Sequence, residues 1–389
     1  MRVIKTTYCL LFLFLSTVIS AQDTNSHPKR NIGVELIGHY GAVVKNWPDF
    51  PQRKGASLIE ANLIKQCTGD KEWHAGYFYP QPGISLIVGS MGNHDILGET
   101  AALVPNFSLV TNRSSSWGMR LRIGVGVAYF NRTWNVNNNR DNLLIGSRFT
   151  NLGLLSFNIR RDISPKLSLH SGLSFIHFSN SHIQLPNVGI NIPAFNLGIN
   201  YFPNARPAIL KNQPVTETHQ KVLFNLRLGL GWHEFGDPVH PTGGPKYAIY
   251  TGSAYLSKRI GKIHNIQAGF HLSYYSSFYR FITSQEYYTS DLRKKSSTAI
   301  IFLGHEYMMG RLSFVTQLGF NLHNPFYRDF RSSTERGKSL KSLNSNRLGL
   351  HYYILDPTHS SKKNLYVSWF VKTNLGQADF GEVGFGYTF

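Results

Sequence analysis

The chain has 389 residues, a formal net charge of +19 at pH 7 and two cysteines, Cys9 and Cys67. Because Cys9 falls in the leader described below, a single thiol is left, which excludes a small secreted scaffold held by intramolecular disulfides. An excess of basic residues is typical of proteins that bind nucleic acid, an anionic membrane surface or a phosphorylated glycolipid. The alternative is a basic surface that is only solvated. No nucleic-acid-binding motif accompanies the charge, so we expect no nucleic acid partner.

Residues 1–21 have the composition of a secretory signal peptide. Arg2 and Lys5 precede the apolar run "YCLLFLFLSTVIS", and the small residues Ser20 and Ala21 end it. The run is too short to span a membrane, and we expect cleavage near Ala21, which exports the rest of the chain. No later segment approaches the roughly 20 uninterrupted apolar residues of a transmembrane helix, so a helical membrane protein is excluded.

Most of the remaining chain alternates small or polar residues with bulky apolar ones. Runs of about ten alternating residues separated by turns are typical of transmembrane barrel strands, in which lipid-facing and lumen-facing positions take turns. We therefore predict an all-β protein, an antiparallel outer-membrane β-barrel of about 12–16 strands between Asn31 and Phe389, with our count reaching about sixteen. The clearest runs are "GMRLRIGVGVAYF" (118–130), "KLSLHSGLSFIHFS" (166–179), "VLFNLRLGLGW" (222–232) and "NIQAGFHLSYY" (265–275).

Three features favour this barrel over a soluble secreted β-sandwich, which would alternate in the same way. Aromatic residues gather at a strand end in "HLSYYSSFYRF" (271–281), as they do at a membrane interface. The chain closes on the alternating strand "GEVGFGYTF", and short turns alternate with long polar loops. The short turns are expected at 161–166, 258–263 and 308–311, and the long loops at 131–142, 234–246, 283–295 and 323–341.

A candidate site lies in the stretch "HFSNSHIQLPNVGIN" (177–191). Side chains alternate across a strand, so His177 and Ser179 share one face and lie close enough for a base to activate a serine nucleophile. A third polar group has to hold the imidazole in the right tautomer, and Asn191 is the candidate. If the hairpin turns around Leu185, Ser179 and Asn191 become cross-strand partners.

The faces of the two strands direct this polar trio toward lipid. The trio shares the parity of Leu173 and Phe175 in the first strand and of the apolar positions of 193–199 in the second. A hydrolase that acts on a membrane lipid needs its site on that face. If the first strand rises from the periplasm, the seventh strand, 166–179, also rises and carries the site near the outer end of the barrel.

The same pattern has an ordinary explanation as a polar strand end. His-x-Ser also occurs at 271–273 and 359–361, so the three-residue pattern alone carries little information. Three further features beside this His-x-Ser favour the esterase interpretation. They are Asn180, the turn "PNVG" (186–189) and the place of the strand in the chain.

With these residues, the sequence resembles the lipid A 3-O-deacylases (PagL-like) and the longer acyloxyacyl hydrolases of Bacteroidetes-type outer membranes. The resemblance rests on "FIHFSN" (175–180), "PNVGIN" (186–191) and "AFNLGINYF" (194–202). The longer relatives look similar over most of the mature chain, including "GGPKYAIYT" (243–251) and "ADFGEVGFGYTF" (378–389).

The resemblance implies a serine esterase that removes a fatty acyl chain from lipid A of lipopolysaccharide without a cofactor. His177 would be the general base, Ser179 the nucleophile and Asn180 part of the oxyanion hole. The family has a Glu at the position of Asn191, and an Asn can orient His177 but cannot stabilise an imidazolium by charge. A second departure is His182, where the short deacylases carry a Gly whose backbone lines the oxyanion hole.

The resemblance also suggests how the chain is divided. One wide barrel and a smaller barrel with a second β-unit both stay open, as does the oligomeric state. The expected parts are a signal peptide (1–21), a tail (22–30) and a barrel (31–389), in which a linker or long turn (203–220) separates a deacylase-like part (31–202) from C-terminal strands (221–389).

We expect the protein in the bacterial outer membrane after signal-peptide cleavage, with lipid A, lipopolysaccharide and other outer-membrane lipids as partners. Basic residues in the outer loops would bind the phosphates of the substrate. The alternative is a non-catalytic barrel, either a channel or a lipopolysaccharide-binding structural protein, in which Asn191 marks lost activity.

One further pair of residues has ligand chemistry. His233 and Glu234 in "WHEFGDP" end a strand and are either a metal pair or, as we expect, part of a solvated loop mouth. The other histidines have no ligand spacing, so we expect no metal site.

Overall fold

The structure, a computed structural model, describes residues 31–389 except for 47–49, 206–220, 237–240, 242, 332–341, 356 and 358–362. The expected signal peptide and tail therefore lie outside the described residues, as does most of the expected linker 203–220.

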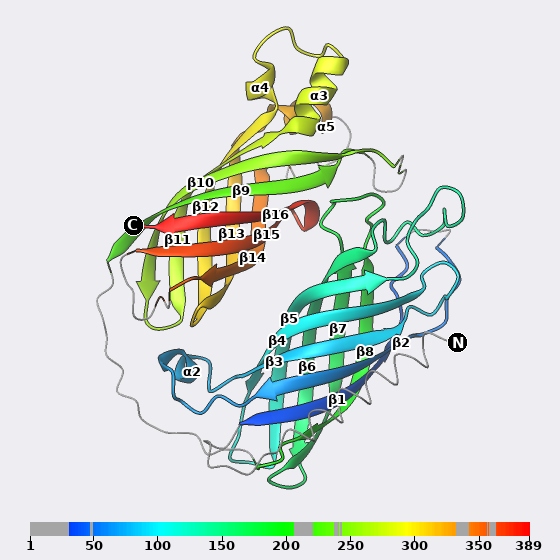
Figure 1. Ribbon diagram of the computed structural model, residues 1–389, viewed down its shortest axis with the longest axis vertical. Helices are drawn as coiled ribbons and strands as arrows, with labels where there is room; N and C mark the ends of the chain where they lie inside the picture. The colour runs from blue at the N-terminus through cyan, green and yellow to red at the C-terminus, as the bar shows by residue number, and fades with distance from the viewer. Residues whose placement is uncertain are drawn as a thin grey trace. The chain divides into compact units, whose positions relative to one another are not determined.

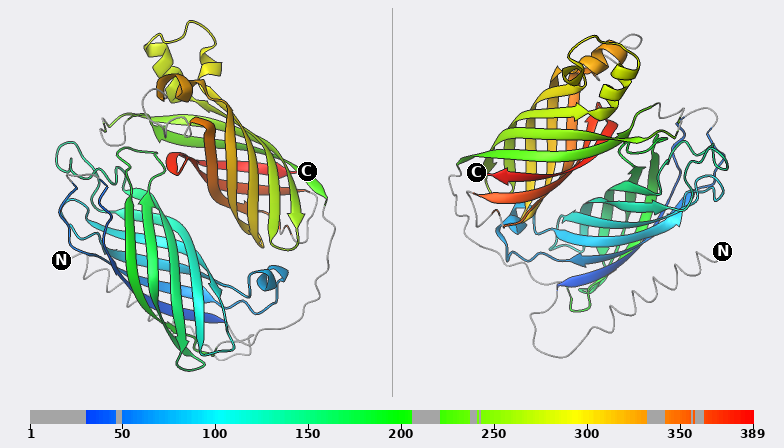
Figure 2. Two further views of the ribbon diagram at one scale, coloured as in Figure 1. Left: turned by 180° about the vertical axis from the view of Figure 1, so that it is seen from behind. Right: turned by 45° about the horizontal axis from the view of Figure 1, so that its top comes forward.

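The chain is all-β and forms two compact units, each built on a closed barrel of eight antiparallel strands (Figures 1 and 2). The described residues form sixteen strands, which confirms the predicted count. Of the two arrangements left open, the structure has a smaller barrel with a second β-unit, which is itself a barrel, and not one wide barrel. Two short segments, Lys71–Gly76 and Asn180–Val188, group with the second unit. Among the described residues, no helix is long and apolar enough to cross a membrane.

In the first barrel each strand pairs with the next along the chain, and β8 returns to β1 with Gly41 opposite Ala194 and Val34 opposite Tyr201. A short helix, α2 (Glu72–Gly76), follows β2. The strands are β1 (Ile32–Gly41), β2 (Ala56–Lys65), β3 (Gln81–Ser90), β4 (Glu99–Val110), β5 (Trp117–Phe130), β6 (Phe149–Asp162), β7 (Leu167–Ser179) and β8 (Ile190–Tyr201).

In the second barrel the last strand closes the sheet by pairing with the first, from Gly381 opposite Trp232 to Thr388 opposite Asn225. The strands are β9 (Val222–Glu234), β10 (Lys246–Ile260), β11 (His264–Tyr275), β12 (Ser297–Met309), β13 (Leu312–His323), β14 (Asn344–Tyr353), β15 (Asn364–Asn374) and β16 (Gln377–Thr388). The predicted short turns lie at the β6–β7, β10–β11 and β12–β13 junctions, where they overlap the strand ends by two or three residues. The predicted long loops 131–142 and 283–295 fall between strands, whereas 237–240, 242 and 332–341 in the other two lie outside the described residues.

The long loops of the second barrel contain helices that the sequence pattern did not predict: α3 (Ser276–Ser284), α4 (Leu292–Lys295) and α5 (Pro325–Arg331). Their aromatic side chains pack on the barrel end. The ring of Phe278 stacks on Tyr275 and on Phe326, with centroids 4.2 and 3.9 Å apart. The aromatic run 271–281, predicted to mark a membrane interface, thus also forms a small core that anchors α3 and α5.

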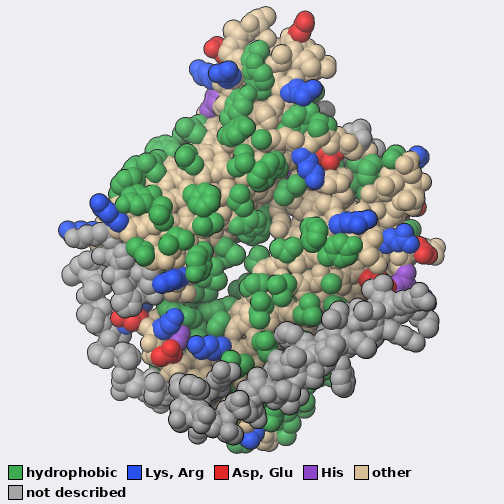
Figure 3. Space-filling view, in the orientation of Figure 1, with side chains coloured by type: hydrophobic (Ala, Val, Ile, Leu, Met, Phe, Trp, Pro, Cys, Tyr) green, Lys and Arg blue, Asp and Glu red, His purple; other side chains and the backbone are tan. Residues whose placement is uncertain are grey.

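Both barrels are apolar outside and polar inside. In β7 the polar side chains of Ser168, His170 and Ser174 are buried, whereas Leu173 and Phe175 on the other face of the strand are exposed. Hydrophobic side chains spread over the visible outer face of each barrel in the space-filling view (Figure 3). An apolar exterior around a polar interior is the arrangement of a transmembrane barrel, whose outer surface contacts lipid.

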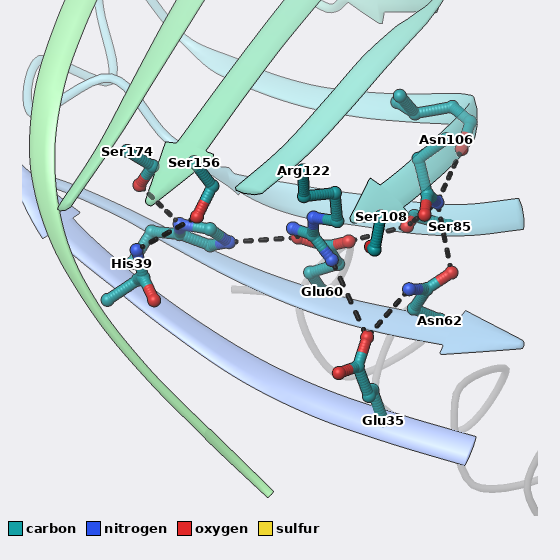
Figure 4. Close-up of polar contacts among 12 residues, drawn as sticks. Glu35, His39, Glu60, Asn62, Ser85, Asn106, Ser108, Arg122, Ser156 and Ser174 are labelled. Carbon is teal, nitrogen blue, oxygen red and sulfur yellow. Dashed lines mark hydrogen bonds and ion pairs between the residues drawn. The ribbon is translucent and has the colours of Figure 1, made fainter. Parts of the chain in front are cut away.

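The interior of the first barrel is filled by paired charges (Figure 4). The Arg122 guanidinium donates to Glu60 over 2.6 Å, and Arg120 donates to Glu35 over 2.9 Å. All four side chains are buried, so each charge loses water and is stabilised by its partner. An eight-stranded barrel is just wide enough for such side chains to fill it.

The second barrel has the same kind of interior. Arg227 and Arg347 each lie 3.4 Å from the Glu382 carboxylate, and Lys372 donates to Asp379 over 2.7 Å. These five side chains are also buried. In both barrels the interior is therefore a packed polar core.

Candidate functional site

The predicted site residues lie at one end of the first barrel, on its outer surface. His177 and Ser179 are half-buried on the face of β7 that carries the exposed Leu173 and Phe175. Asn191, the second residue of β8, is half-buried on the outer face of that strand. The predicted strand faces are thus confirmed, because all three side chains point away from the lumen.

The structure joins His177 and Asn191 directly. They are opposite each other in the β7–β8 ladder, and the His177 Nδ1 atom lies 2.7 Å from Asn191 Oδ1. An amide oxygen can only accept, so Nδ1–H donates and the Nε2 lone pair of the neutral ring is left to act as a base. This is the tautomer that a general base for Ser179 requires.

The predicted cross-strand pairing of Ser179 with Asn191 is wrong. The register places Asn191 opposite His177 and Ile190 opposite Phe178, and Ser179 ends β7. The connection is not a symmetric hairpin about Leu185 but a loop of irregular backbone, so equal spacing from its middle residue does not set the register. The observed pairing brings the orienting amide to the imidazole itself.

The loop after Ser179 is held by its own side chains. The backbone N–H of Asn180 donates to Asn187 Oδ1 over 2.9 Å, and Asn180 Nδ2 donates to the carbonyl oxygen of Gln184 over 2.6 Å. The predicted oxyanion residue Asn180 is therefore buried and held within the loop by its backbone and its side chain. Asn187 of the turn "PNVG" thus fixes Asn180, a role that the sequence pattern alone does not indicate.

Backbone conformation explains one departure from the family pattern. His182 has a φ of 66°, and Ser181 before it has a φ of 57°. This left-handed region is where Gly is favoured, so the backbone keeps the shape of a glycine position although a His occupies it. Gly189, with a φ of 82°, also matters, because a Cβ there would lie 3.3 Å from His177 Cε1 and 3.0 Å from the carbonyl oxygen of Phe178.

A second serine–histidine–carboxylate chain lies inside the same barrel (Figure 4). His39 Nδ1 is 2.9 Å from Ser174 Oγ, and His39 Nε2 is 2.9 Å from Glu60 Oε2. All three residues are buried, and Glu60 is also bound by Arg122. A lipid ester cannot reach this serine, so the chain belongs to the packed interior.

The second His-x-Ser pattern, 271–273, is also structural. His271, from the second His-x-Ser, lies inside the second barrel, where its Nδ1 is 2.6 Å from Ser253 Oγ. The third pattern, 359–361, lies outside the described residues.

The expected solvated loop mouth at His233 and Glu234 is wrong, because both side chains are buried. His233 Nε2 lies 2.6 Å from Ser277 Oγ, and the Glu234 carboxylate accepts from the backbone N–H groups of Leu185 and Gly244 over 2.9 and 2.7 Å. The Glu234 carboxylate therefore stabilises the backbone of two loops by accepting these hydrogen bonds. Among the described residues, no group of three or more His, Cys, Asp or Glu side chains is placed to hold a metal ion.

Two family models match the sequence. Residues 59–200 match the model described as lipid A 3-O-deacylase (PagL), and residues 222–389 match the one described as acyloxyacyl hydrolase, C-terminal domain. The first match runs from β2 to β8 and includes His177, Ser179 and Asn191, whereas the second covers the strands of the second barrel.

No curated protein matches the chain. Among solved structures, the outer membrane enzyme PagL is 18% identical with a TM-score of 0.30, and the match covers 42% of this chain and 97% of that one. CdiB from Acinetobacter baumannii is 8% identical with a TM-score of 0.20, over 92% of this chain and 60% of that one.

Proposed function

Since the chain belongs to the family of lipid A 3-O-deacylases and acyloxyacyl hydrolases, we propose that it removes an ester-linked fatty acyl chain from lipid A in the bacterial outer membrane. The observation that carries this proposal is the 2.7 Å contact between His177 Nδ1 and Asn191 Oδ1 on the outer surface of the barrel. That surface is where the acyl chains of a membrane lipid lie.

In the proposed mechanism Ser179 is the nucleophile and His177 is the base. Ser179 Oγ attacks the ester carbonyl carbon while its proton passes to His177 Nε2, and the carbonyl oxygen becomes an oxyanion. The C–O bond to the lipid A sugar then breaks, and the imidazolium returns the proton to the leaving sugar oxygen. Water hydrolyses the acyl-serine by the same proton transfers and releases a free fatty acid.

Asn180 and Asn191 support these steps in different ways. We assign Asn180, which follows Ser179 directly in the chain, to the oxyanion hole, as the family resemblance implies. Asn191 fixes the plane and tautomer of His177 but adds no negative charge. Imidazolium formation is therefore less favoured than beside a carboxylate, and we propose that this enzyme is slower than a relative with Glu at this position.

Basic loop residues suit a phosphorylated substrate. Lys45, Arg132, Arg140 and Arg148 are exposed in the β1–β2 and β5–β6 loops, which lie at the same end of the barrel as His177. Guanidinium and ammonium groups bind phosphate by charge-assisted hydrogen bonds. We assign the phosphates of lipid A to this group of side chains.

The competing function is a non-catalytic barrel. A channel is disfavoured, because paired charges fill the interior of each barrel among the described residues. A lipopolysaccharide-binding structural protein agrees with Asn191 in place of the family Glu, and it makes the opposite prediction in the experiment below.

The test is to express the full chain in an outer membrane and follow lipid A acylation by mass spectrometry. We expect wild type to release one acyl chain and Ser179→Ala to release none. Ser174→Ala is the matched control, because Ser174 lies on the same strand and contacts His39 but is buried in the lumen. Unchanged lipid A with a folded wild type would refute the proposed hydrolase.

A further inference from the structure

The outer surface beside His177 has a distinct row of residues. The registers place Val125 of β5 opposite Gly153 of β6, Gly153 opposite His177, and His177 opposite Asn191. Directly opposed residues of antiparallel strands project from the same face, with Cβ atoms about 5 Å apart. Gly153 therefore flanks the imidazole on the side away from Asn191.

Gly153 leaves a notch in this surface. Among the described residues, a Cβ on Gly153 would have no atom within 4 Å, so none of them fills the space above its backbone. The notch is bordered along β6 by Leu155, which is 49% exposed, and across β7 by Phe175, which is 44% exposed. These apolar side chains border a gap one side chain deep that opens toward lipid.

Packing does not require a glycine at this position. A Cβ on Gly126 would lie 2.2 Å from the carbonyl oxygen of Leu103, and one on Gly172 would lie 2.0 Å from that of Phe157, so those two glycines allow close backbone approach. Gly153 has no such neighbour, and its φ is not positive. A glycine in a strand lowers strand propensity and usually marks a close approach by something else.

We infer that Gly153 determines substrate specificity: its notch takes the part of the fatty acyl chain next to the ester carbonyl, so that the carbonyl lies over His177 and Ser179. The inference rests on the proposed function and names how the acyl group is seated. Adjacent strands are about 4.8 Å apart, so one missing side chain leaves a width close to that of a single alkyl chain. Leu155 and Phe175 supply apolar contacts to the methylene groups.

A larger side chain at residue 153 would close the notch. Gly153→Val and Gly153→Leu fill it progressively, and a β-branched residue on an outward strand position favours the strand, so Gly153→Val should fold. Gly38 of β1 gives a matched control, because it also faces outward in the first barrel and a Cβ there has nothing within 4 Å. It pairs with β8 at Leu197, well away from Asn191, and has no pairing with β6 or β7.

The experiment compares the purified full-length variants on p-nitrophenyl esters of acetate and of dodecanoate. We expect Gly153→Leu to lower kcat/KM for dodecanoate at least tenfold while the value for acetate stays within about threefold of wild type. Gly153→Val should be intermediate, and Gly38→Leu should match wild type on both esters. Heat-dependent gel mobility checks that each barrel is folded.

The outcomes separate the two proposals. An active wild type in which Gly153→Leu changes neither ester, lowers both equally, or behaves as Gly38→Leu does would overturn the role of Gly153 and leave the hydrolase in place. A folded wild type that cleaves neither these esters nor lipid A would overturn the proposed function and the specificity inference with it.

Discussion

Replacing Asn191 by Asp adds a negative charge beside His177 and changes little else. Asp and Asn have the same shape, so the acceptor oxygen stays 2.7 Å from His177 Nδ1. The carboxylate stabilises the imidazolium that forms when the base takes the Ser179 proton, whereas the neutral amide does not. We therefore expect Asn191→Asp to raise kcat, and Asn191→Glu to raise activity or leave it intact.

The size of the gain follows from Coulomb's law. With the charge centres about 4 Å apart, the attraction is about 1 kcal/mol in water and about 4 kcal/mol at an effective dielectric constant of 20. His177 is half-buried on the barrel surface, which places it between these limits. A stabilisation of about 1.4–3 kcal/mol corresponds to a gain of about 10- to 150-fold in rate.

The assay is the rate of fatty acid release from lipid A in detergent micelles, measured by mass spectrometry at saturating substrate. Asn191→Leu is the matched control, because it keeps the volume but removes the acceptor, and it should lower kcat at least tenfold. If Asn191→Asp and Asn191→Leu are both as active as wild type, Asn191 does not orient His177. If Asn191→Glu is dead while Asn191→Asp gains, the longer carboxylate does not fit this loop.

Three further changes test the structure around the site and in the second barrel. His182→Gly relieves a left-handed backbone that costs about 1 kcal/mol for a non-glycine residue, so its thermal midpoint should rise; a fall would mean that the imidazole makes a stabilising contact. Phe178→Ala removes a fully buried ring and should lower the free energy of unfolding by about 3–5 kcal/mol in urea titration; a loss below about 1 kcal/mol would indicate a loosely packed interior. Burial, together with the hydrogen bond to Asp329, raises the pKa of Tyr288 to about 12, so the folded state favours the neutral phenol. The stability that this phenol adds is therefore complete below about pH 10 and is lost as the pH rises toward 12. The ultraviolet difference titration of wild type against Tyr288→Phe should show that midpoint, and a midpoint near 10 would contradict it.

Sequence patterns were sufficient to predict which face each side chain occupies, but not how the strands pair. The period of two in "LSFIHFS" (173–179) directs His177 outward whichever strand lies beside it. Register depends on the loop, and the loop depends on positive φ at Ser181 and His182 and on the Asn187–Asn180 bond, which no local pattern encodes. The error of two residues in the partner of Asn191 follows from that difference.

The number of barrels could not be predicted from the sequence, for a related reason. Closure requires β8 to pair with β1 and β16 with β9, over sequence separations that alternation does not record. Sixteen amphipathic strands satisfy the same pattern as one barrel or as two. The sequence pattern did not predict α3, because its aromatic residues also suit a strand end at a membrane interface. It did not predict α5, because 325–331 lies in the stretch 323–341, which the pattern indicated as a long polar loop.

Residue type alone does not single out Ser179, the proposed nucleophile, among the serines of this barrel. Ser174 has a histidine at 2.9 Å, and that histidine has a carboxylate at 2.9 Å, yet all three are sealed in the lumen. Ser179 is half-buried on the lipid-facing surface, at the same barrel end as the notch at Gly153. For a water-soluble substrate and an open lumen the choice would be reversed. Because lipid reaches only the outer face and the lumen is filled, access outweighs the strength of the hydrogen-bonded chain, and the comparison of Ser174→Ala with Ser179→Ala tests that order directly.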